Sequence, residues 1–493
     1  MKPNIVIILL DAVRAQNLPF YGYDRNTTPF LSSVADEFCI YQNAISSSYW
    51  TMPSIASLFT GMYTSSHGLL ADLDKLDDAL LTLPQILKNN GYRCAAFGRN
   101  IYVSDYTGLD RYFDDFYSIT GIDRIKTLSG KISKRFLNDI LPPGINRLYQ
   151  GTINAGNSKK QKIFNTAARF VDVFMDSGGR KFVSNFSNWL KKNRSTPFFT
   201  YIHLLETHAP YRAPLNFATK FLSMQANLKK LFVNHNHLNY MLNRAPMTSQ
   251  DFEILVGAYD NSICYSDYLI KKIVHSLKKY HIFDDTMVVI LSDHGDNIGE
   301  HGLMSHYWCL YDTLIKIPLL IKFPAAAGMR GSVSRVVQNV DIVPTILALL
   351  EENDPKIWNQ VQGNDLSGQA ACKREEGIAI SELVKVFGPD REKFKAQLNQ
   401  YDRRLLSIRT QDLKFIHSSR GDHEFYDLAK DPTESHNLYP GDDRCSTLKE
   451  KALTYFKRMD DFYRQNIEKI DGRIEVEKAD ASVIERLKSL GYM

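Results

Sequence analysis

The chain has 493 residues, of which 44% are hydrophobic and 23% are charged, and its formal net charge is +5. A chain of this length and apolar content can bury a large core, which excludes a largely disordered protein. Its six cysteines are scattered without a C-x-x-C pair, which argues against a disulfide framework and against a structural zinc site.

The first apolar run, residues 4–10, is typical of a strand buried on both faces of a sheet. Asp11 follows at its carboxyl end, where ligands gather in open α/β sheets, so it is a candidate metal ligand; capping of the next segment explains the position equally well. The run is too short to cross a membrane and lacks a cleavage site. We therefore expect a cytoplasmic protein, at most peripheral to a membrane.

The stretch at residues 50–61 predicts a helix that begins close to Thr51. Pro53 and Ser54 suit a first helical turn, and Gly61 can end the helix. Unpaired N–H groups and the positive end of the helix dipole then lie beside the Thr51 hydroxyl and favour an anionic group there. Taken alone, the position also fits a simple helix cap.

Strands and helices alternate along most of the remaining chain, which indicates helices on both faces of a largely parallel sheet. Later short runs at hairpin spacing indicate a smaller antiparallel sheet. We expect a catalytic α/β/α domain at residues 1–372 and a smaller α+β subdomain with a helical tail at residues 373–493. The expected strands are 38–45, 93–97, 197–205, 286–291, 317–323, 377–382, 405–409, 413–417 and 424–427, and the expected helices include 80–89, 258–279 and 340–350.

The segment at residues 124–194 holds fifteen Lys or Arg and three Asp, a surplus of twelve in a chain whose net charge is only +5. Its helical patterns interrupt the alternation, so we predict a basic helical insertion at about residues 124–196. Such a face can attract a polyanionic glycan or an acidic membrane surface. Most basic helical faces are simply solvated, and no nucleic-acid partner is expected.

Besides the stretch around Thr51, the run at residues 288–302 carries candidate site residues. Its apolar residues lead directly into Asp293 and His294, again at the carboxyl end of a strand, and the two side chains can bind one cation together with Asp11 and Thr51. His208 and His306 lie in loops just beyond other strands.

In order along the chain, these motifs resemble the sulfatase-like branch of the alkaline phosphatase superfamily. The resemblance spans about residues 3–440 and is weakest at residues 124–196. It is carried by Asp11, T-x-P-S-x-x-x-x-x-T-G from Thr51, T-H-x-P-Y around His208, S-D-H-G from Ser292 and the late Y-D-L-A-K-D-P-T-E-S-H-N-L run at residues 426–438, and the ending at residues 484–492 is similar as well.

The resemblance implies an alkaline-phosphatase-like α/β/α sandwich with a metal-centred site. Asp11, Asp293 and His294 map onto metal positions, and Thr51 onto a metal-bound nucleophile that attacks phosphorus or sulfur and forms a covalent intermediate. His208 maps onto the histidine that contacts the transferred group or the leaving oxygen. Arg99 or Asn100 falls where many sulfatases have a lysine that reaches the anion.

Three departures from the sulfatase pattern refine this expectation. Thr51 replaces the cysteine or serine that becomes formylglycine, and Ile55 replaces the usual arginine; a secondary alcohol cannot become that aldehyde, so no formylglycine is expected. Ala12 replaces a calcium-binding aspartate, which together with His294 favours zinc or manganese over calcium. No histidine follows an aspartate by four residues, so we expect one divalent cation, with His208 and His306 binding substrate; a second cation held by these histidines is the alternative.

These features predict a metal-dependent hydrolase or transferase that acts on a phosphodiester or phosphonate monoester through Thr51. The alternatives are a sulfate-ester hydrolase that tolerates threonine, a phospho-group transferase that modifies a surface glycan docked on the basic insertion, and a non-catalytic binding protein with a decayed site.

Overall fold

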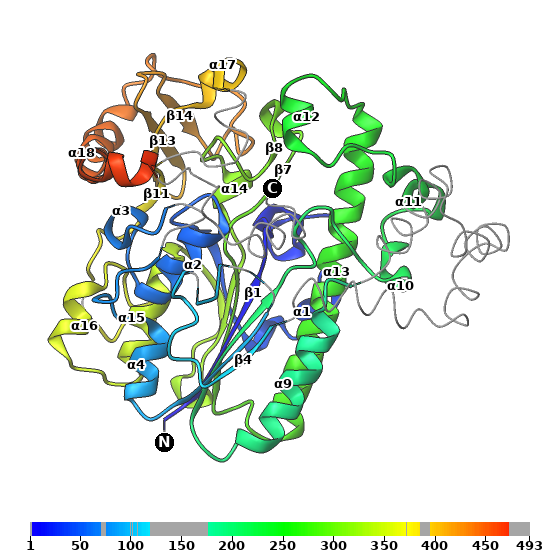
Figure 1. The fold of residues 1–493 in the computed structure, drawn as a ribbon, viewed down its shortest axis with the longest axis vertical. Coiled ribbons are helices and arrows are strands. Elements are labelled where there is room, and N and C mark those ends of the chain that lie inside the picture. The colour runs from blue at the N-terminus through cyan, green and yellow to red at the C-terminus, as the bar shows by residue number, and fades with distance from the viewer. Residues whose placement is uncertain are drawn as a thin grey trace.

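The computed structural model describes residues 2–70, 75–98, 100, 102–105, 107–118, 176–370, 372–384 and 395–472. These residues form a large α/β layer structure and a smaller sheet packed at one end of it (Figure 1). Among them, no helix is long and apolar enough to cross a membrane.

The central sheet has eight strands in the order β10-β2-β9-β6-β1-β5-β3-β4. All neighbouring strands run parallel except β9, which runs antiparallel to both β2 and β6. The prediction of a largely parallel sheet is therefore confirmed. The strands are β1 (Asn4–Leu10), β2 (Cys39–Ile45), β3 (Arg93–Phe97), β4 (Asp115–Tyr117), β5 (Phe198–Leu204), β6 (Thr286–Ser292), β9 (Leu319–Lys322) and β10 (Gly331–Gln338).

Helices cover both faces of this sheet because its central strands are apolar on both sides. In β1, the side chains of Ile5, Ile7 and Leu9 pack toward one helical layer, and those of Val6, Ile8 and Leu10 pack toward the other. The first layer includes α2 (Thr51–Thr60), α4 (Leu83–Asn89), α15 (Ile342–Leu349) and α16 (Pro355–Gln360), and the second includes α1 (Pro29–Ser33), α9 (Gly179–Asn193) and α13 (Ser249–Lys279).

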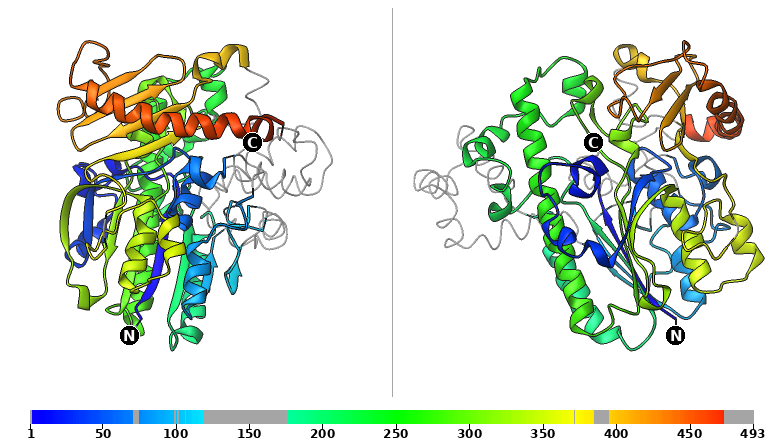
Figure 2. Two further views of the ribbon diagram at one scale, coloured as in Figure 1. Left: turned by 90° about the vertical axis from the view of Figure 1, so that its left-hand side faces the viewer. Right: turned by 180° about the vertical axis from the view of Figure 1, so that it is seen from behind.

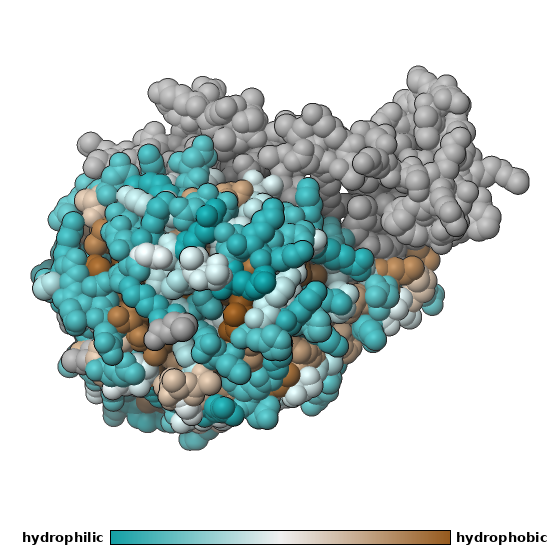
Figure 3. Space-filling view, turned by 90° about the horizontal axis from the view of Figure 1, so that it is seen from below, coloured by the Kyte–Doolittle hydropathy of each residue, from teal (hydrophilic) through white to brown (hydrophobic). Residues whose placement is uncertain are grey.

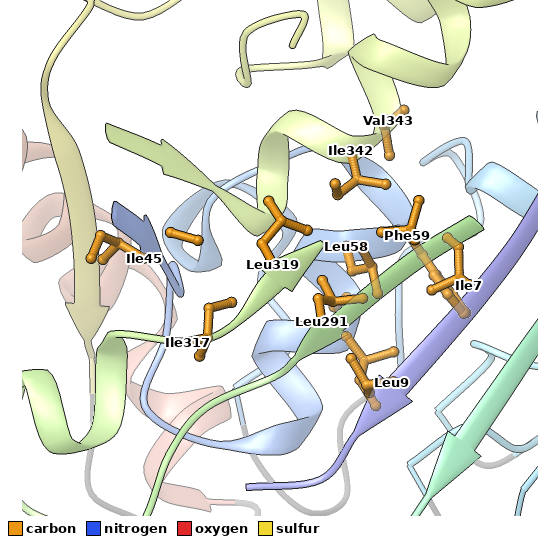
Figure 4. Packing of buried hydrophobic residues seen from close by; sticks show 14 of the residues in the cluster. Ile7, Leu9, Ile45, Leu58, Phe59, Leu291, Ile317, Leu319, Ile342 and Val343 are labelled. Atoms are coloured by element: carbon orange, nitrogen blue, oxygen red, sulfur yellow. The ribbon is translucent and has the colours of Figure 1, made fainter. Parts of the chain in front are cut away.

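Helix α2 is buried along its whole length, and this burial fixes the position of Thr51. Leu58 and Phe59 face Ile7, Leu9 and Leu291 of the sheet in the close view of Figure 4. The helix begins at Thr51 and ends at Gly61, whose φ of 69° lies in the left-handed region that glycine adopts without strain. The predicted start and end of this helix are confirmed.

Helix α13 begins nine residues earlier than the sequence pattern predicted. Thr248 accepts a hydrogen bond from the Asp251 N–H, and the Asp251 carboxylate accepts one from the Thr248 N–H, so a capping box starts the helix at Ser249. The apolar periodicity becomes clear only at Ala258 because the first turns are partly exposed.

The smaller sheet has four antiparallel strands, β11 (Ala379–Leu383), β12 (Leu405–Arg409), β13 (Leu413–Ser418) and β14 (Glu424–Asp427). Helix α18 (Cys445–Gly472) packs across β12 and β13 and buries Leu448, Ala452 and Met459 (Figure 2). The predicted antiparallel C-terminal sheet is confirmed.

Short elements fill the connections. They are the two-stranded ribbon β7 (Asn297–Ile298) and β8 (Met304–Ser305), the helices α3 (Thr64–His67), α10 (Leu215–Ala218), α11 (Met224–Lys230), α12 (His237–Met241), α14 (Asp312–Ile315) and α17 (Lys395–Leu398), and the 3-10 turns Ala15–Asn17, Pro19–Tyr21, Ala35–Glu37, Glu300–Gly302, Ala325–Ala327, Asn339–Asp341 and Asn399–Tyr401.

Most of the predicted basic insertion falls on residues 119–175, outside the described residues. The part that is described forms α9, whose buried Phe182, Phe186 and Leu190 pack on the sheet and on α13. This end of the segment therefore belongs to a helical layer of the large domain. The face of the molecule seen in Figure 3 is mainly hydrophilic, with hydrophobic side chains scattered across it.

Candidate active site

The site lies at the carboxyl ends of three adjacent strands, β5, β1 and β6. Leu10 pairs with Ser292, so the next residues of these two parallel strands, Asp11 and Asp293, emerge side by side. His203 lies within β5, opposite Leu9. The strand register therefore brings two carboxylates and an imidazole to one buried edge of the sheet.

Asp11 is fully buried, and its two oxygens have different surroundings. Oδ2 accepts hydrogen bonds from His203 Nε2 at 3.0 Å and from Asn100 Nδ2 at 3.3 Å. Oδ1 accepts no hydrogen bond within the described part of the chain. The donors thus fix the carboxylate through one oxygen and leave the other facing the site.

Asp293 repeats this arrangement from the opposite side. Its Oδ1 accepts hydrogen bonds from the backbone N–H groups of Ala12 and His294, each at 3.0 Å. Its Oδ2 has no hydrogen-bond donor among the described residues and lies 3.5 Å from His294 Nε2. Ala12 adopts a left-handed φ of 59°, which turns its N–H toward Asp293 and is a strained conformation for a residue with a Cβ.

Thr51 contacts the metal-ligand candidates through His294. Thr51 Oγ1 lies 3.0 Å from His294 Nε2, and both side chains are completely buried. His294 Nδ1 lies 2.7 Å from the carbonyl oxygen of Gly295, which can only accept, so Nδ1 carries the proton and Nε2 presents its lone pair to Thr51. The Thr51 hydroxyl is therefore the donor in this pair.

Serine side chains join the helix that carries Thr51 to the loop that carries Asp293. Ser54, on the first turn of α2, donates to the carbonyl oxygen of Asp293 at 2.8 Å, and Ser46 donates to the same oxygen at 2.5 Å. These buried hydrogen bonds fix the position of Thr51 relative to Asp293. A catalytic site needs such rigid support because its reacting groups must keep a precise geometry.

The donor set fits a divalent cation. Ligand atoms of Asp11, His203 and Asp293 all lie within 4.8 Å of one another, and two buried carboxylate oxygens have no hydrogen-bond donor among the described residues. Such oxygens are costly to bury unless a cation compensates them. Burial raises the pKa of Asp11, but the hydrogen bond from His203 and the nearby His208 outweigh it and hold the pKa well below its usual range, so the carboxylate stays ionised.

His208 and His306 lie beside this centre. The centroid of the His306 ring lies 4.5 Å from the centroid of the His294 ring and 5.3 Å from that of the His208 ring. His208 Nδ1 donates to the carbonyl oxygen of Ala209 at 2.8 Å. His306 therefore lies against His294, and His208 lies against His306. The predicted roles of both histidines in the reaction stay a prediction.

Asp296 contacts the His306 ring. Its Oδ1 lies 3.4 Å from His306 Nδ1, and its Oδ2 accepts a hydrogen bond of 2.6 Å from the Tyr211 hydroxyl. Burial raises the pKa of Asp296, yet the hydrogen bond and charge of His306 lower it below its usual range overall. Burial also lowers the pKa of His306.

The structure thus brings together Asp11, Thr51, Asp293 and His294, the four residues predicted to hold the metal. Asn100 was predicted to bind substrate; its amide instead contacts Asp11, and a substrate contact stays a prediction. Arg99, the other predicted substrate ligand, lies outside the described residues.

Sequence reasoning missed His203 and Asp296. The signal for His203 was an ionisable residue within the apolar run 198–204, because a buried histidine in a central strand needs a polar partner. For Asp296 the signal was a third acidic or basic side chain within four residues of Asp293 and His294, in a segment that is otherwise apolar or glycine-rich.

Comparisons with known proteins agree with this geometry. Residues 3–352 match the family model described as Sulfatase, and residues 299–460 match the model described as N-sulphoglucosamine sulphohydrolase, C-terminal. The chain belongs to the sulfatase family. The predicted resemblance to the sulfatase-like branch of the alkaline phosphatase superfamily is confirmed, and this sulfatase-family chain is a hydrolase-type enzyme whose relatives depend on metal ions.

Several relatives of this sulfatase-family chain align over almost its whole length. It is 22% identical to the uncharacterized sulfatase YidJ of Escherichia coli, covering 94% of the chain and 89% of that protein. It is 24% identical to the multifunctional alkaline phosphatase superfamily protein PehA of Trinickia caryophylli, covering 92% and 95%. Its fold is similar to the crystal structure of a phosphonate monoester hydrolase of Agrobacterium radiobacter, with a TM-score of 0.67, 19% identity and coverage of 94% and 96%.

Proposed function

We propose that this sulfatase-family protein is a metal-dependent hydrolase or transferase that acts on a phosphodiester or phosphonate monoester, with Thr51 as the nucleophile. The observation that carries the proposal is the buried Thr51 hydroxyl, 3.0 Å from His294 Nε2, beside two aspartates that each have one buried oxygen without a hydrogen-bond donor among the described residues. A capping role alone would leave the two carboxylate oxygens unexplained.

Asp11, Asp293, His294 and Thr51 would hold one divalent cation, and zinc or manganese fits a set that includes an imidazole better than calcium does. When bound, such a cation supplies Lewis acidity, which lowers the pKa of a coordinated hydroxyl and offsets charge on phosphoryl oxygens. His203 and Asn100 would keep the Asp11 carboxylate in the correct orientation through their bonds to Oδ2.

In the reaction, the Thr51 oxygen forms a bond to phosphorus as the bond from phosphorus to the leaving alcohol breaks. In this structure the Thr51 hydroxyl donates to His294 Nε2, which carries the only free lone pair of that ring. When His294 holds a cation through this lone pair, the Thr51 hydroxyl would pass its proton to solvent, and the oxygen would present its remaining lone pairs to an incoming ester. The N-terminus of α2 adds backbone N–H groups that favour negative charge beside Thr51. Attack of water, or of an acceptor alcohol, on the phosphothreonine ester then restores the hydroxyl.

His208 and His306 are the groups that would contact the leaving oxygen and the transferred group. They come from two different loops, and their rings lie 5.3 Å apart. Asp296, whose Oδ1 lies 3.4 Å from His306 Nδ1, would keep the His306 ring in place. A leaving alcohol needs a proton most when it is a poor leaving group, so these histidines matter most for unactivated esters.

A sulfate-ester hydrolase is the second candidate, because both family models that match the chain are named after sulfatases. The residue at position 51 favours the first candidate. A threonine carries a secondary alcohol, so it cannot be converted into the formylglycine aldehyde, whereas it can form a phosphate ester directly.

The two candidates are separated by comparing turnover of bis-p-nitrophenyl phosphate, p-nitrophenyl phenylphosphonate and p-nitrophenyl sulfate by the metal-loaded protein. We expect at least one phosphorus ester to have the highest kcat/KM, and mass spectrometry of quenched reactions to find the phosphorus adduct on the peptide that contains Thr51. Faster turnover of the sulfate than of both phosphorus esters would replace the first candidate with the second.

A further inference from the structure

A pocket of about 330 Å³ lies where the large domain meets the small sheet. Its walls come from the segment after α2, the segment after α16, β11 and α18, elements that lie together in Figure 1. The residues that line it do not include Asp11, Thr51, Asp293 or His294. Its volume is within the range of small-ligand sites, roughly 300–1,000 Å³.

The floor of the pocket presents a buried carboxylate, Glu382. Ser65 donates to it twice, from its N–H to Oε2 and from its hydroxyl to Oε1, each at 2.7 Å. Each carboxylate oxygen has a second lone pair, which can accept a hydrogen bond from a ligand hydroxyl. Glu382 is only 4% exposed, so this acceptor is directed into the pocket and away from bulk solvent.

The next wall offers a hydroxyl donor. Ser66 Oγ accepts a hydrogen bond of 3.0 Å from Gln362 Nε2, while Gln362 Oε1 accepts from the Tyr63 N–H at 2.8 Å. Since its oxygen is already an acceptor, the Ser66 hydroxyl proton can be donated to a ligand oxygen. The Gln362 amide is fixed by both bonds, so this wall is rigid.

The side wall is held by a buried ion pair. Arg374 makes a bidentate contact with Asp341, at 2.8 and 3.0 Å, and also donates to the Tyr63 hydroxyl at 3.3 Å. The positive charge of Arg374 is therefore compensated before any ligand arrives. This arrangement keeps the pocket open by fixing its walls to each other, since bidentate pairs of this kind restrict geometry.

The rim carries two cations that are not compensated in this way. Lys373 and Arg458 are both exposed and make no ion pair with any residue that the structure describes. The Arg458 guanidinium lies 5.7 Å from the centre of the Tyr455 ring, which also lines the pocket. Two cations that flank a polar pocket favour a ligand that carries an anionic group.

We propose that this pocket is a second ligand site, distinct from the active site, which binds an acidic saccharide. Glu382 and Ser66 would bind sugar hydroxyls, Tyr455 would border the ring, and Lys373 and Arg458 would bind a sulfate or carboxylate substituent. The lining is too polar for an apolar ligand, and a carboxylate floor disfavours a bare anion. The inference does not depend on the identity of the nucleophile.

The test is direct binding of defined oligosaccharides to the full-length protein by isothermal titration calorimetry at low ionic strength. The probes are a sulfated tetrasaccharide, a carboxylated tetrasaccharide, a neutral tetrasaccharide and inorganic sulfate. We expect at least one acidic tetrasaccharide to bind, and the double variant Lys373→Ala/Arg458→Ala to weaken that binding by at least about tenfold, the loss of two charge-assisted contacts. The variant Glu382→Gln should weaken it as well, through the hydroxyl contact.

The matched control is Lys356→Ala/Lys457→Ala, which removes two exposed lysines outside the pocket and changes the net charge equally. It should leave binding unchanged, and turnover of a small chromogenic ester should be the same in the pocket variant and the unmodified protein. Equal weakening in pocket and control variants would overturn the site. So would equally tight binding of the neutral tetrasaccharide, displacement of the saccharide by inorganic sulfate at equal concentration, or a parallel loss of turnover in the pocket variant.

Discussion

Two clusters of buried acidic side chains in this protein have opposite electrostatic arrangements. At the active site, Asp11 and Asp293 are fixed through one oxygen each, and the other oxygen has no donor among the described residues. At the junction between the large domain and the small sheet, Asp312 forms two ion pairs. Its Oδ2 lies 3.0 Å from Arg409 Nη2, and its Oδ1 lies 3.0 Å from Lys414 Nζ. The active-site carboxylates can therefore bind a cation from solution, whereas the junction carboxylate is already paired with cationic side chains of the protein.

The junction cluster also includes Glu434. Its Oε2 accepts the Asp312 N–H at 2.6 Å, and its Oε1 lies 2.7 Å from Lys414 Nζ. Burial raises the pKa of Asp312, but Arg409 and Lys414 outweigh it and hold the pKa far below its usual range. Arg409 and Lys414 come from β12 and β13, so the cluster attaches the small sheet to α14.

The difference shows how to distinguish a functional acidic cluster from a structural one. Burial is the same in both, since all of these carboxylates are at most 8% exposed. What differs is whether the protein itself supplies the positive charge. Two buried carboxylates without a cationic partner, at the carboxyl ends of parallel strands, indicate a binding site. Carboxylates that form ion pairs with Lys or Arg between two sheets indicate a structural contact.

The largest effect should come from removing the nucleophile. Thr51→Ala should lower kcat by more than about 1,000-fold because it removes the attacking hydroxyl, while the fold stays close to that of the unmodified protein. Steady-state kinetics with the best phosphorus ester measures this. Thr51→Ser is the matched control and should keep turnover within about tenfold; a loss below tenfold in Thr51→Ala would show that the nucleophile is misassigned.

The next effect contrasts the two clusters directly. Asp312→Ala leaves Arg409 and Lys414 without their partner and should lower the free energy of unfolding by about 3–5 kcal/mol, as expected for a broken buried ion pair. Chemical denaturation of the apo-protein measures it. Asp293→Asn should instead abolish tight metal binding in elemental analysis and leave the apo-protein equally stable or more so. If the two variants exchanged these behaviours, the assignment of the clusters would be reversed.

A smaller effect is expected from His203, which acts through Asp11. His203→Phe should weaken metal binding by about 10–100-fold, the usual cost of removing a partner that orients a ligand. Competition with a chelator measures the affinity. Tyr201→Phe, which removes the hydroxyl 3.1 Å from His203 Nδ1, should weaken it less. A changed visible spectrum of the cobalt-loaded His203 variant would identify His203 as a direct ligand instead of a positioning residue.

The smallest effect concerns Asp267, a buried carboxylate that forms no ion pair with any residue that the structure describes. Burial raises its pKa to about 7, although backbone N–H groups of Leu31 and Phe30 donate to it. Since this folded-state pKa lies above the unfolded value, its stabilising contribution is complete below about pH 4 and is lost as the pH rises through about 7.

The variant Asp267→Asn should remove this pH dependence and lower the stability by about 1 kcal/mol at neutral pH, because the amide can accept from only one of the two backbone N–H groups and the other loses its acceptor. Denaturation midpoints between pH 4 and 8 measure it. An unchanged slope of stability against pH in Asp267→Asn would assign the titration to another group.

The sequence determined the fold class and most of the strands. Continuous apolar runs such as residues 4–10 and 286–292 can only be strands covered on both faces, and the polar residues that follow them, Asp11 and Asp293, must then lie at one edge of the sheet. The start of α2 at Thr51 followed from Pro53 and Gly61 in the same way. These features depend on local pattern, so a single sequence contains them.

Only the tertiary structure decided which oxygen of each aspartate accepts hydrogen bonds from the protein and which one is left without a donor among the described residues. That choice depends on Ala12, His203 and Asn100, which come from three separate segments and meet Asp11 and Asp293 only through the order and register of the strands. The same holds for the pocket lined by Glu382 and Arg374, whose walls come from segments far apart in the chain. Contacts between residues far apart in the chain carry no periodic signal in the sequence, because their positions are set by how the sheets and helices pack.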